Sequence, residues 1–365
     1  MVDLSGVLRE AVTRRASDIH LKAGCPPILR IATQLVSLDH PPLAPSEIEA
    51  VAQSLVGKIQ WASFLSGAEL DVAYLDPAAG RFRTNIFHQR GMVGIVMRHV
   101  QTSVPGFKDL GLPPIIKKIA LTERGIVIVS GATGSGKSTT LAAMIDFINA
   151  RLRRHIVTIE DPIEFIHDDV KSLIEQREVG IDTRSFPSAL RCVMRQDPDI
   201  IMVGEMRDKE SFMAVLAAAD VGRLSLATLH SPDAAQVVLR VMDFFPVAER
   251  EQARLQLAAN VVAIICQRLI PRADGKGAIP AVEIMLGTTT VRKLIRENKV
   301  GKLTAAIQDG KDLGMQTFNQ ALVELVQASL ITEDAALSHS PSPESLKMNL
   351  QGIYLDESRQ ILGDD

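Results

Sequence analysis

The stretch GATGSGKSTT, from Gly131 to Thr140, constrains the fold of this chain more than any other feature of the sequence. It matches the pattern G-x-x-x-x-G-K-[ST] at every fixed position. Glycines in such a loop let backbone N–H groups turn toward phosphate oxygens without a Cβ in the way. The pattern predicts that Lys137 reaches the β- and γ-phosphates and that the Ser138 hydroxyl ligates Mg²⁺. We therefore expect ATP and Mg²⁺ as cofactors. The residues expected to line the nucleotide are Gly131, Ala132, Thr133, Gly134, Ser135, Gly136, Lys137, Ser138 and Thr139.

Both flanks of the loop fit this prediction. The preceding run, Gly125–Ser130, is apolar and rich in β-branched residues, as in a buried parallel strand. After the loop, apolar residues recur at helical spacing from Leu141 to Leu152. A strand, a loop and a helix in this order place the phosphates at a helix N-terminus, where the helix dipole favours anions.

Length and charge narrow the class of protein. A chain of 365 residues is expected to hold two or three domains. Its 40 basic and 43 acidic residues form no basic block, so we expect no nucleic acid partner. The three cysteines, Cys25, Cys192 and Cys266, are dispersed, which suits a reducing cytosol and supplies no zinc site. The longest apolar run, Val261–Cys266, is too short to cross a bilayer, and the first ten residues are too polar for a signal peptide. We expect a soluble intracellular protein.

The first hundred residues predict a mixed α+β domain. Residues 1–16 carry an apolar helical face, and Ser46 with Glu49 forms a capping box for a helix that ends near Leu55. The alternating runs Arg81–Phe87 and Val93–Val100, joined by a turn, predict a hairpin. A period of two puts Arg81 and Arg83 on one face. From spacing alone, that face is as consistent with a solvated sheet edge as with a ligand site.

The Pro- and Gly-rich stretch 101–114 is interpreted as a linker, after which the pattern changes. Strands then alternate with helices, which predicts a parallel sheet covered on both faces. A long helix is expected over 248–269, then a strand at Ala281–Met285, helical sequence and a loosely packed tail from Ser338. The predicted domains are 1–100, the ATPase core 115–285, and a helical C-terminal region 286–365.

An acidic cluster follows the strand predicted at Ile156–Glu160. It comprises Glu160, Asp161 and Glu164. Ligands bind beyond the carboxyl ends of strands in open parallel sheets. One of these acids is therefore a candidate to orient the attacking water or accept its proton. The alternative is an acidic surface loop, which the nearby P-loop makes less favoured.

Two further apolar strands end in polar residues. The strand predicted at Ile200–Glu205 has the Walker B form, in which Glu205 holds Mg²⁺ or its water shell. Asp197 and Asp199 precede that strand, so we interpret them as cap or turn residues. The strand predicted at Leu224–His230 ends in a histidine that can report the γ-phosphate by hydrogen bonding, although a lone histidine is more often structural.

Taken together, these motifs resemble the type IV pilus retraction ATPases, the PilT/PilU group of the secretion ATPase superfamily. The segments that carry the resemblance are ASDIHLKAGCPPILR, GRFRTNIFHQR, GATGSGKSTT, VTIEDPIEF, EQREVGIDT, DIIMVGEMRD, SLATLH and LGMQTFNQAL. Their order matches that of the family, and they cover nearly the whole chain.

The resemblance implies an N-terminal PAS-like domain, a RecA-like ATPase domain and a homohexameric ring that powers pilus retraction. It implies that Glu164 is the catalytic base and Glu205 the Walker B acid, with Lys137 and His230 beside them. It further implies that three arginines, Arg81, Arg83 and Arg98, help to bind nucleotide phosphate once the linker lets the N-terminal domain close. The expected partners are an inner-membrane pilus platform protein at the cytoplasmic face of the membrane and, as a further candidate, a paralogous retraction ATPase.

The sequence departs from the family pattern at three places. Arg223 stands where the His box usually has histidine, Ala132 stands where the closest group commonly has proline, and Thr290–Glu297 replaces an AIRNLIRE element. If residue 223 approaches the nucleotide, Arg223→His is expected to add an inflection to the pH profile between about pH 6 and 7.5.

Other functions stay open at this stage. They are a PilU-like accessory ATPase, an assembly or secretion ATPase, and a regulatory ring subunit with poor turnover. Assembly ATPases of this superfamily usually carry a four-cysteine zinc module, which three dispersed cysteines do not supply. A nucleic-acid translocase would share the core fold, but the basic signature expected of one is lacking.

Overall fold

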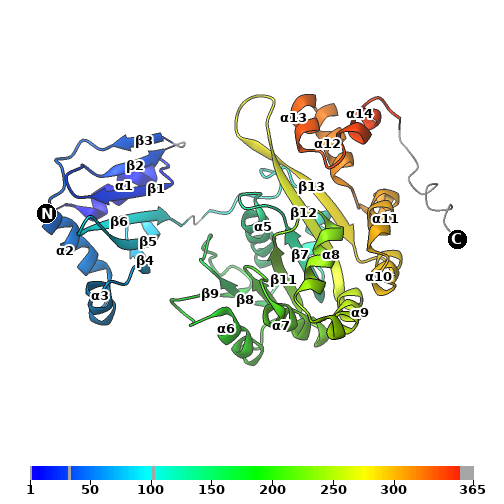
Figure 1. Ribbon diagram of the computed structural model, residues 1–365, viewed down its shortest axis with the longest axis horizontal. Coiled ribbons are helices and arrows are strands. Elements are labelled where there is room, and N and C mark those ends of the chain that lie inside the picture. The colour runs from blue at the N-terminus through cyan, green and yellow to red at the C-terminus, as the bar shows by residue number, and fades with distance from the viewer. Residues whose placement is uncertain (1, 32–33, 101–102, 354–365) are drawn as a thin grey trace. The chain divides into compact units, whose positions relative to one another are not determined.

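The computed structural model describes residues 2–31, 34–100 and 103–353. The chain divides into two compact units (Figure 1). The first comprises 1–103 with the short segment 164–166, and the second comprises 104–163 and 167–365. Gln101 and Thr102 of the predicted linker lie outside the described residues. Phe107 and Leu112, which belong to the same predicted linker, are buried in the core of the second unit.

The first unit is an antiparallel six-stranded sheet with three helices. The strand order is β3-β2-β1-β6-β5-β4. Its strands are β1 (Asp18–Lys22), β2 (Ile28–Ile31), β3 (Gln34–Ser37), β4 (Leu70–Asp76), β5 (Gly80–Gln89) and β6 (Met92–His99), and its helices are α1 (Leu4–Thr13), α2 (Pro45–Leu55) and α3 (Lys58–Leu65). This is the α+β architecture that the sequence predicts, although β3 and α3 were missed.

The predicted hairpin is confirmed as β5 and β6, which pair with Arg83 opposite Arg98. Phe82, Thr84 and Ile86 are buried on one face of β5, whereas Arg81 and Arg83 lie half-buried on the other. The period of two therefore predicts the face of both arginines correctly.

The predicted capping box at Ser46 is wrong. Helix α2 begins at Pro45, with Ala44 at the N-cap position. The carboxylate of Glu47, not Glu49, accepts a hydrogen bond from the Ala44 backbone N–H at 3.0 Å. Proline at the first helical position has the fixed φ that suits a helix start, so the helix begins one residue before the capping signal.

The second unit is built on a seven-stranded sheet in the order β13-β12-β7-β11-β10-β8-β9. All neighbours pair in parallel except β12 and β13. The strands are β7 (Gly125–Ser130), β8 (His155–Glu160), β9 (Leu173–Glu178), β10 (Ile200–Val203), β11 (Leu224–Leu229), β12 (Val261–Pro271) and β13 (Ala278–Leu286). The predicted parallel sheet is therefore present. Walker B strand β10 ends at Val203, so Glu205 lies just beyond it.

Helices cover both faces of this sheet. The helices of the second unit are α4 (Ile115–Ala120), α5 (Lys137–Asn149), α6 (Phe186–Val193), α7 (Lys209–Asp220), α8 (Ala234–Asp243), α9 (Arg250–Asn260), α10 (Thr289–Arg296), α11 (Leu303–Asp309), α12 (Phe318–Gln327), α13 (Glu333–His339) and α14 (Pro343–Leu350). One apolar core joins the sheet to α4 and α5, and the other joins it to α6 through α9 and the C-terminal helices.

The helix predicted over 248–269 is confirmed as α9 (Arg250–Asn260) and is wrong from residue 261 onward. Helix α9 ends at Asn260, and the chain continues directly as β12, which pairs in parallel with β7. The short apolar run from Val261 fits a buried strand and a buried helix equally well by periodicity. Its β-branched residues favour the strand, and pairing with the P-loop strand decides the outcome.

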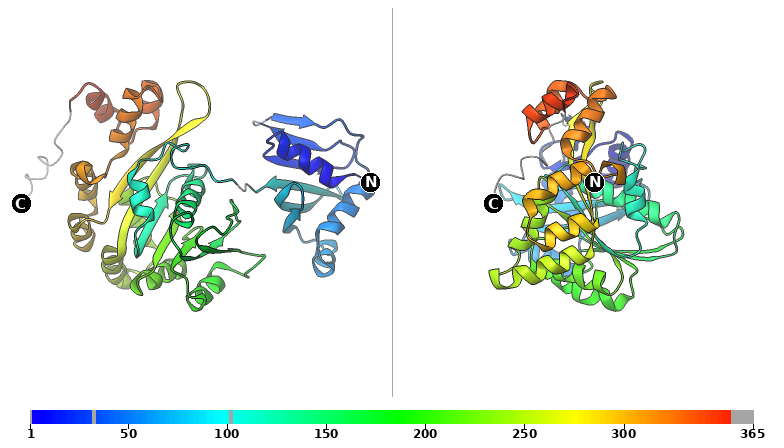
Figure 2. Two further views of the ribbon diagram at one scale, coloured as in Figure 1. Left: turned by 180° about the vertical axis from the view of Figure 1, so that it is seen from behind. Right: turned by 90° about the vertical axis from the view of Figure 1, so that its right-hand side faces the viewer.

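The predicted loose tail from Ser338 is also wrong for its first part. Residues up to 353 include the end of α13 and all of α14, and Leu346 is fully buried in the core. Figures 1 and 2 show α12 and α13 beside the β12–β13 ribbon, and α14 packs against these two helices. Residues 354–365 lie outside the described residues. None of the helices in the described part of the chain has the length and apolar content that crossing a membrane requires.

Candidate active site

The P-loop joins the end of β7 to the start of α5. Gly131 has φ +147°, and a Cβ there would lie 2.5 Å from the Gln267 carbonyl oxygen and from Ser135 Oγ. Gly136, which precedes α5, is in the left-handed region at φ +90°. Side chains at these two positions would clash or be strained, so glycine keeps the loop narrow enough for its N–H groups to form a phosphate cradle.

Lys137 lies in the first turn of α5 and is buried. Its Nζ donates hydrogen bonds to the carbonyl oxygens of Gly131 and Ala132, both at 2.9 Å. Burial lowers the pKa of Lys137, and the charge of Glu205 partly opposes that shift. The ammonium group is thus held across the loop, where it can exchange carbonyl partners for phosphate oxygens.

A hydroxyl at the end of β7 connects the P-loop strand to the residue that follows the His box, the segment SLATLH that ends at His230. Ser130 Oγ donates to the Ser231 carbonyl at 2.8 Å and accepts from the Ser231 N–H at 2.9 Å. Strand β11 therefore ends beside the P-loop, because it pairs with β7 along its whole length. The residue that follows β11 is His230.

Strand order brings the Walker B acid and the His box together. Strand β11 lies between β7 and β10, so both predicted residues emerge from the carboxyl edge of the sheet. His230 Nε2 lies 3.3 Å from Glu205 Oε1. Beside that contact, the Thr228 hydroxyl donates to the Gly204 carbonyl, and the Met206 N–H donates to the Thr228 carbonyl at 2.9 Å. The end of β10 is thereby fixed to the end of β11.

Arg207 is a charged neighbour of Glu205 that the sequence reasoning missed. Its Nε and one terminal nitrogen lie 2.9 and 2.7 Å from Glu205 Oε2, and a second terminal nitrogen lies 3.9 Å from Asp161. The hydrogen bond to Glu205 raises the pKa of Arg207. Glu205 is therefore held between a guanidinium and an imidazole. The only signal in the sequence was the short spacing in Glu205-Met206-Arg207.

The two glutamates of the acidic cluster differ in environment. Glu160, the last residue of β8, is buried, and its Oε1 accepts from Thr158 Oγ1 at 2.7 Å and from Gln176 Nε2 at 3.2 Å. Glu164 is exposed on the segment between β8 and β9. A carboxylate engaged in a buried network is poorly suited to accept a proton from water, so Glu164 is the better candidate base.

The three arginines assigned to phosphate binding belong to the first unit, where they interact with residues of that unit or with other described partners. Arg98 Nε donates to Asp18 Oδ1 at 2.8 Å, and Arg83 lies 3.9 Å from Asp71. Arg81 is half-buried and has interaction partners of its own. Arg98 thus pairs two strands of the sheet through Asp18, in addition to the phosphate-binding role expected from the family resemblance.

Arg223 does not approach the P-loop of its own chain. It precedes β11 and so lies at the amino edge of the sheet, opposite the P-loop. Its guanidinium lies 2.9 Å from Asp197 and 3.3 Å from Asp199. Asp199 also accepts a hydrogen bond from the His155 N–H at 2.9 Å. The interpretation of both aspartates as turn residues is confirmed, whereas a role for Arg223 at the nucleotide conflicts with the direction of the strand.

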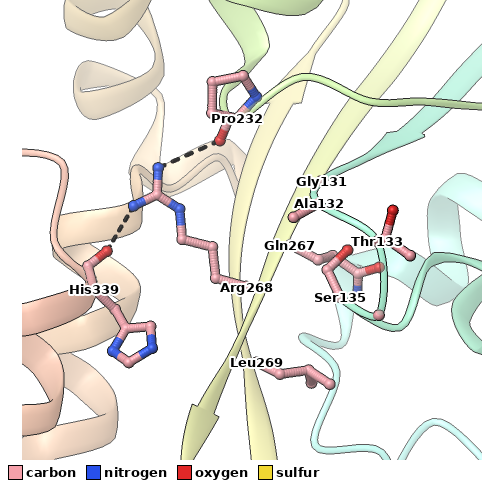
Figure 3. Close-up of a pocket in the computed structure, with 10 residues that line it drawn as sticks. Gly131, Ala132, Thr133, Ser135, Pro232, Gln267, Arg268, Leu269 and His339 are labelled. Carbon is pink, nitrogen blue, oxygen red and sulfur yellow. Dashed lines mark hydrogen bonds between the residues drawn. The ribbon is translucent and has the colours of Figure 1, made fainter.

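A pocket of about 360 Å³ opens along the P-loop (Figure 3). Its lining residues are Gly131, Ala132, Thr133, Gly134, Ser135, Pro232, Gln267, Arg268, Leu269 and His339. Sequence reasoning did not assign the last five to the nucleotide site. Pro232 lies in the His-box exit, the segment 231–233 between β11 and α8, whereas the others belong to β12 and α13. The Oγ of Ser135 and the Oε1 of Gln267 are buried without a hydrogen-bond partner in the described part of the chain.

These features fit a nucleotide. A narrow glycine cradle, a buried lysine and an unpartnered serine hydroxyl on the loop are what a polyphosphate needs. Within residues 2–31, 34–100 and 103–353, no group of three or more His, Cys, Asp or Glu side chains is arranged to hold a metal ion. Magnesium that accompanies a nucleotide usually keeps several waters and takes one or two protein ligands, so Ser138 and Glu205 fit that demand.

Comparison with known proteins places this geometry in a family. Residues 78–332 match the family described as "Type II/IV secretion system protein". The chain is 42% identical over 344 residues to the type IV pilus retractation ATPase PilT of Pseudomonas aeruginosa, covering 94% of this chain and all of the relative. It is 39% identical over 350 residues to the type IV pilus ATPase PilU of the same organism, covering 96% and 92%.

A solved structure shows the same fold. The crystal structure of the pilus retraction motor PilT with bound ADP superposes with a TM-score of 0.88 at 41% identity. The match covers 95% of this chain and 99% of that chain. Both units are therefore shared, since a match over 95% of the chain includes most of the residues of each unit.

Proposed function

Because the chain belongs to the Type II/IV secretion system protein family, we propose that it is an ATP-hydrolysing motor that powers type IV pilus retraction. One observation supports this most strongly: the P-loop, Glu205 and His230 meet at one edge of a parallel sheet whose fold matches that of a pilus retraction motor. We propose that the working form is a homohexamer.

In this proposal, the phosphates of ATP lie in the P-loop from Gly131 to Thr139, and Lys137 turns from the loop carbonyls to the β- and γ-phosphates. Ser138 and Glu205 would hold Mg²⁺, which would supply positive charge that neutralises the phosphates. Arg207 and His230 hold the Glu205 carboxylate in its orientation. A shift of the Glu205 carboxylate would therefore alter its contact with His230.

Glu164 acts as the general base in this scheme. It accepts a proton from the water that attacks the γ-phosphorus, while Glu160 stays in its buried network. Arg81, Arg83 and Arg98 supply positive charge to the phosphates, an assignment that rests on the family resemblance. The domains proposed with it are 1–100, the linker 101–114, the core 115–285 and the helical region 286–365.

The proposed setting rests on the family resemblance. The ring would lie in the cytoplasm at the inner face of the cytoplasmic membrane, against a pilus platform protein. A second candidate function is an accessory ATPase of the PilU kind. The chain is 42% identical to PilT and 39% identical to PilU, so sequence identity does not separate the two candidate functions.

Deletion of the gene with live imaging of surface pili tests the proposal. A primary retraction motor predicts pili that accumulate and fail to shorten. An accessory ATPase predicts retraction that persists at low load and fails under high load. Normal retraction in both conditions would contradict a retraction function, and loss of pili altogether would indicate an assembly ATPase.

A further inference from the structure

Two charged residues on neighbouring strands project from the same face of the β12–β13 ribbon. Cys266 pairs with Glu283 across the strands, and Arg268 lies two residues after Cys266. Side chains alternate along a strand, so Arg268 and Glu283 share a face, and Gln267 lies on the other. Gln267 Nε2 donates to Thr140 Oγ1 of α5 at 2.9 Å on that other face.

Arg268 joins two segments that are far apart in the sequence. Its guanidinium donates to the His339 carbonyl at the end of α13 at 2.6 Å and to the Pro232 carbonyl at 3.5 Å (Figure 3). Its Cζ also lies 4.3 Å from the centre of the Phe318 ring, in the first turn of α12. One side chain thus contacts the His-box exit and the C-terminal helices.

Glu283 also joins the segment after the His box to the C-terminal helices, but it accepts hydrogen bonds where Arg268 donates them. Its Oε1 accepts from the Ala234 N–H, at the start of α8, at 2.7 Å. The Phe318 N–H, at the start of α12, also hydrogen-bonds to this carboxylate. Glu283 is only 5% exposed. Two helix N-termini therefore converge on one buried carboxylate, which is where a negative charge is favourable.

The bridged segments begin at the nucleotide site. Pro232 follows His230 by two residues, and Ser231 between them is hydrogen-bonded to the end of the P-loop strand. Pro232, Arg268 and His339 also line the pocket along the P-loop. A nucleotide in that pocket lies against the two carbonyl-bearing residues that Arg268 holds.

We propose that Arg268 and Glu283 are positioning residues that couple nucleotide binding at the P-loop to the placement of helices α12 and α13. The inference rests on the proposed nucleotide site. When a nucleotide changes the position of the His-box exit, Arg268 and Glu283 carry that change to Phe318 and His339. The coupling needs no contact between the nucleotide and α12.

Protonation of Glu283 supplies an independent readout. Burial, helped by the charge of Asp233 at the α8 cap, raises the pKa of Glu283 to about 7, although the hydrogen bonds from the two helix N-termini and the charge of Arg268 act to lower it. The Cys266 thiol, whose pKa burial raises, lies beside the carboxyl as a neutral group. Below pH 7 the neutral carboxyl binds the two helix N-termini more weakly. Coupling is therefore stronger at pH 8 than at pH 6.

Hydrogen exchange on the full-length protein, with and without ADP as the probe, tests the coupling. At pH 8, ADP is expected to slow exchange in α5 and also, by at least about threefold, in peptides spanning 318–339. Because Arg268 lines the pocket, ADP is added until the protection of α5 is saturated in each variant. Under that condition, Arg268→Gln should lose the protection of 318–339. Arg268→Lys should restore it in part, since an ammonium can hold one carbonyl. Arg272→Gln is the matched control, because Arg272 pairs with Asp274 within the same ribbon.

Glu283→Gln keeps the size of the side chain and removes its titration. In the wild-type protein, the protection of 318–339 by ADP should fall between pH 8 and pH 6, whereas in Glu283→Gln it should not change with pH. Protection of α5 without protection of 318–339 in the wild-type protein would overturn the coupling and leave the nucleotide site intact. No protection of α5 would contradict the nucleotide site itself and this inference with it. Full protection of 318–339 in Arg268→Gln would also overturn the coupling.

Discussion

The two edges of the ATPase sheet carry similar ion pairs and serve different purposes. Strand β11 has Arg223 before its first residue and His230 after its last. Arg223 lies beside Asp197 and Asp199, and His230 lies beside Glu205. Each end of the strand thus pairs a basic group with carboxylates.

The surroundings separate the two pairs. At the carboxyl edge, Glu205 lies on the same side of the sheet as the P-loop, and its charge acts on the buried Lys137. At the amino edge, Asp199 accepts from the His155 N–H and holds the start of β8. The difference teaches that the direction of a parallel strand decides whether a charged residue lies beside the P-loop or at the opposite edge of the sheet.

Removing the lysine of the carboxyl edge should have the largest effect. Lys137→Ala deletes the only side chain of the P-loop that reaches the phosphates as a point charge, so binding and turnover both fail. We expect kcat/KM to fall by about 10⁴-fold or more. Steady-state ATPase assays with nucleotide titration measure it. Unchanged turnover would contradict the P-loop assignment.

The next largest effect is expected at the acidic segment after β8. Glu164→Gln should keep nucleotide binding and lower turnover by about 10²- to 10⁴-fold, because only the proton acceptor is lost. Glu160→Gln is the matched control. Compared with Glu164→Gln, it should lower turnover less and the melting temperature more, since Glu160 lies in a buried hydrogen-bond network. ATPase rates and melting curves of both variants decide the assignment. Equal and mild effects on turnover would end it.

A smaller, divided effect is expected for Arg98. Arg98→Ala removes a guanidinium that pairs with the buried Asp18, so the first unit should lose about 1 kcal/mol of stability. If Arg98 also binds phosphate, ATPase activity should fall by about tenfold while the hexamer persists. Denaturant unfolding, activity and oligomer mass on one sample separate the two roles. A stability loss with normal turnover would restrict Arg98 to the structural role.

The smallest effect on turnover is expected at the amino edge. Arg223→His places a titrating group beside Asp197 and Asp199, on the side of the sheet opposite the P-loop. The pH profile of turnover should therefore match that of the wild-type protein, with no new inflection between about pH 6 and 7.5. A new inflection in the pH profile of the variant would contradict this expectation. It would mean that residue 223 acts on a nucleotide bound by a neighbouring subunit.

The sequence predicted the parts of this site that local patterns determine. The P-loop, the strands that flank it and the face of Arg81 and Arg83 follow from spacing and period. The capping residue of α2 was mispredicted, because Pro45 starts the helix earlier than the Ser46 signal. Local patterns thus locate motifs well and element boundaries less well.

Tertiary pairing accounts for what the sequence did not reveal. Strand β12 was predicted as helix, because an apolar run has no periodicity that separates the two states. That error hid Gln267, Arg268 and Leu269, which reach the pocket only because β12 pairs with β7. His339 was likewise assigned to a loose tail, and only the packing of α13 against the β12–β13 ribbon brings it to the pocket.

The most direct test of the account compares the two acids that flank β10. Glu205→Gln and Asp199→Asn each neutralise one carboxylate that pairs with a basic group, one at each edge of the sheet. Steady-state ATP hydrolysis should fall by about 10²-fold or more in Glu205→Gln. In Asp199→Asn it should stay within about twofold of the wild-type rate, as expected for a structural ion pair near the surface. Equal rates in the two variants, or a larger loss in Asp199→Asn, would contradict the claim that the carboxyl edge is the catalytic edge.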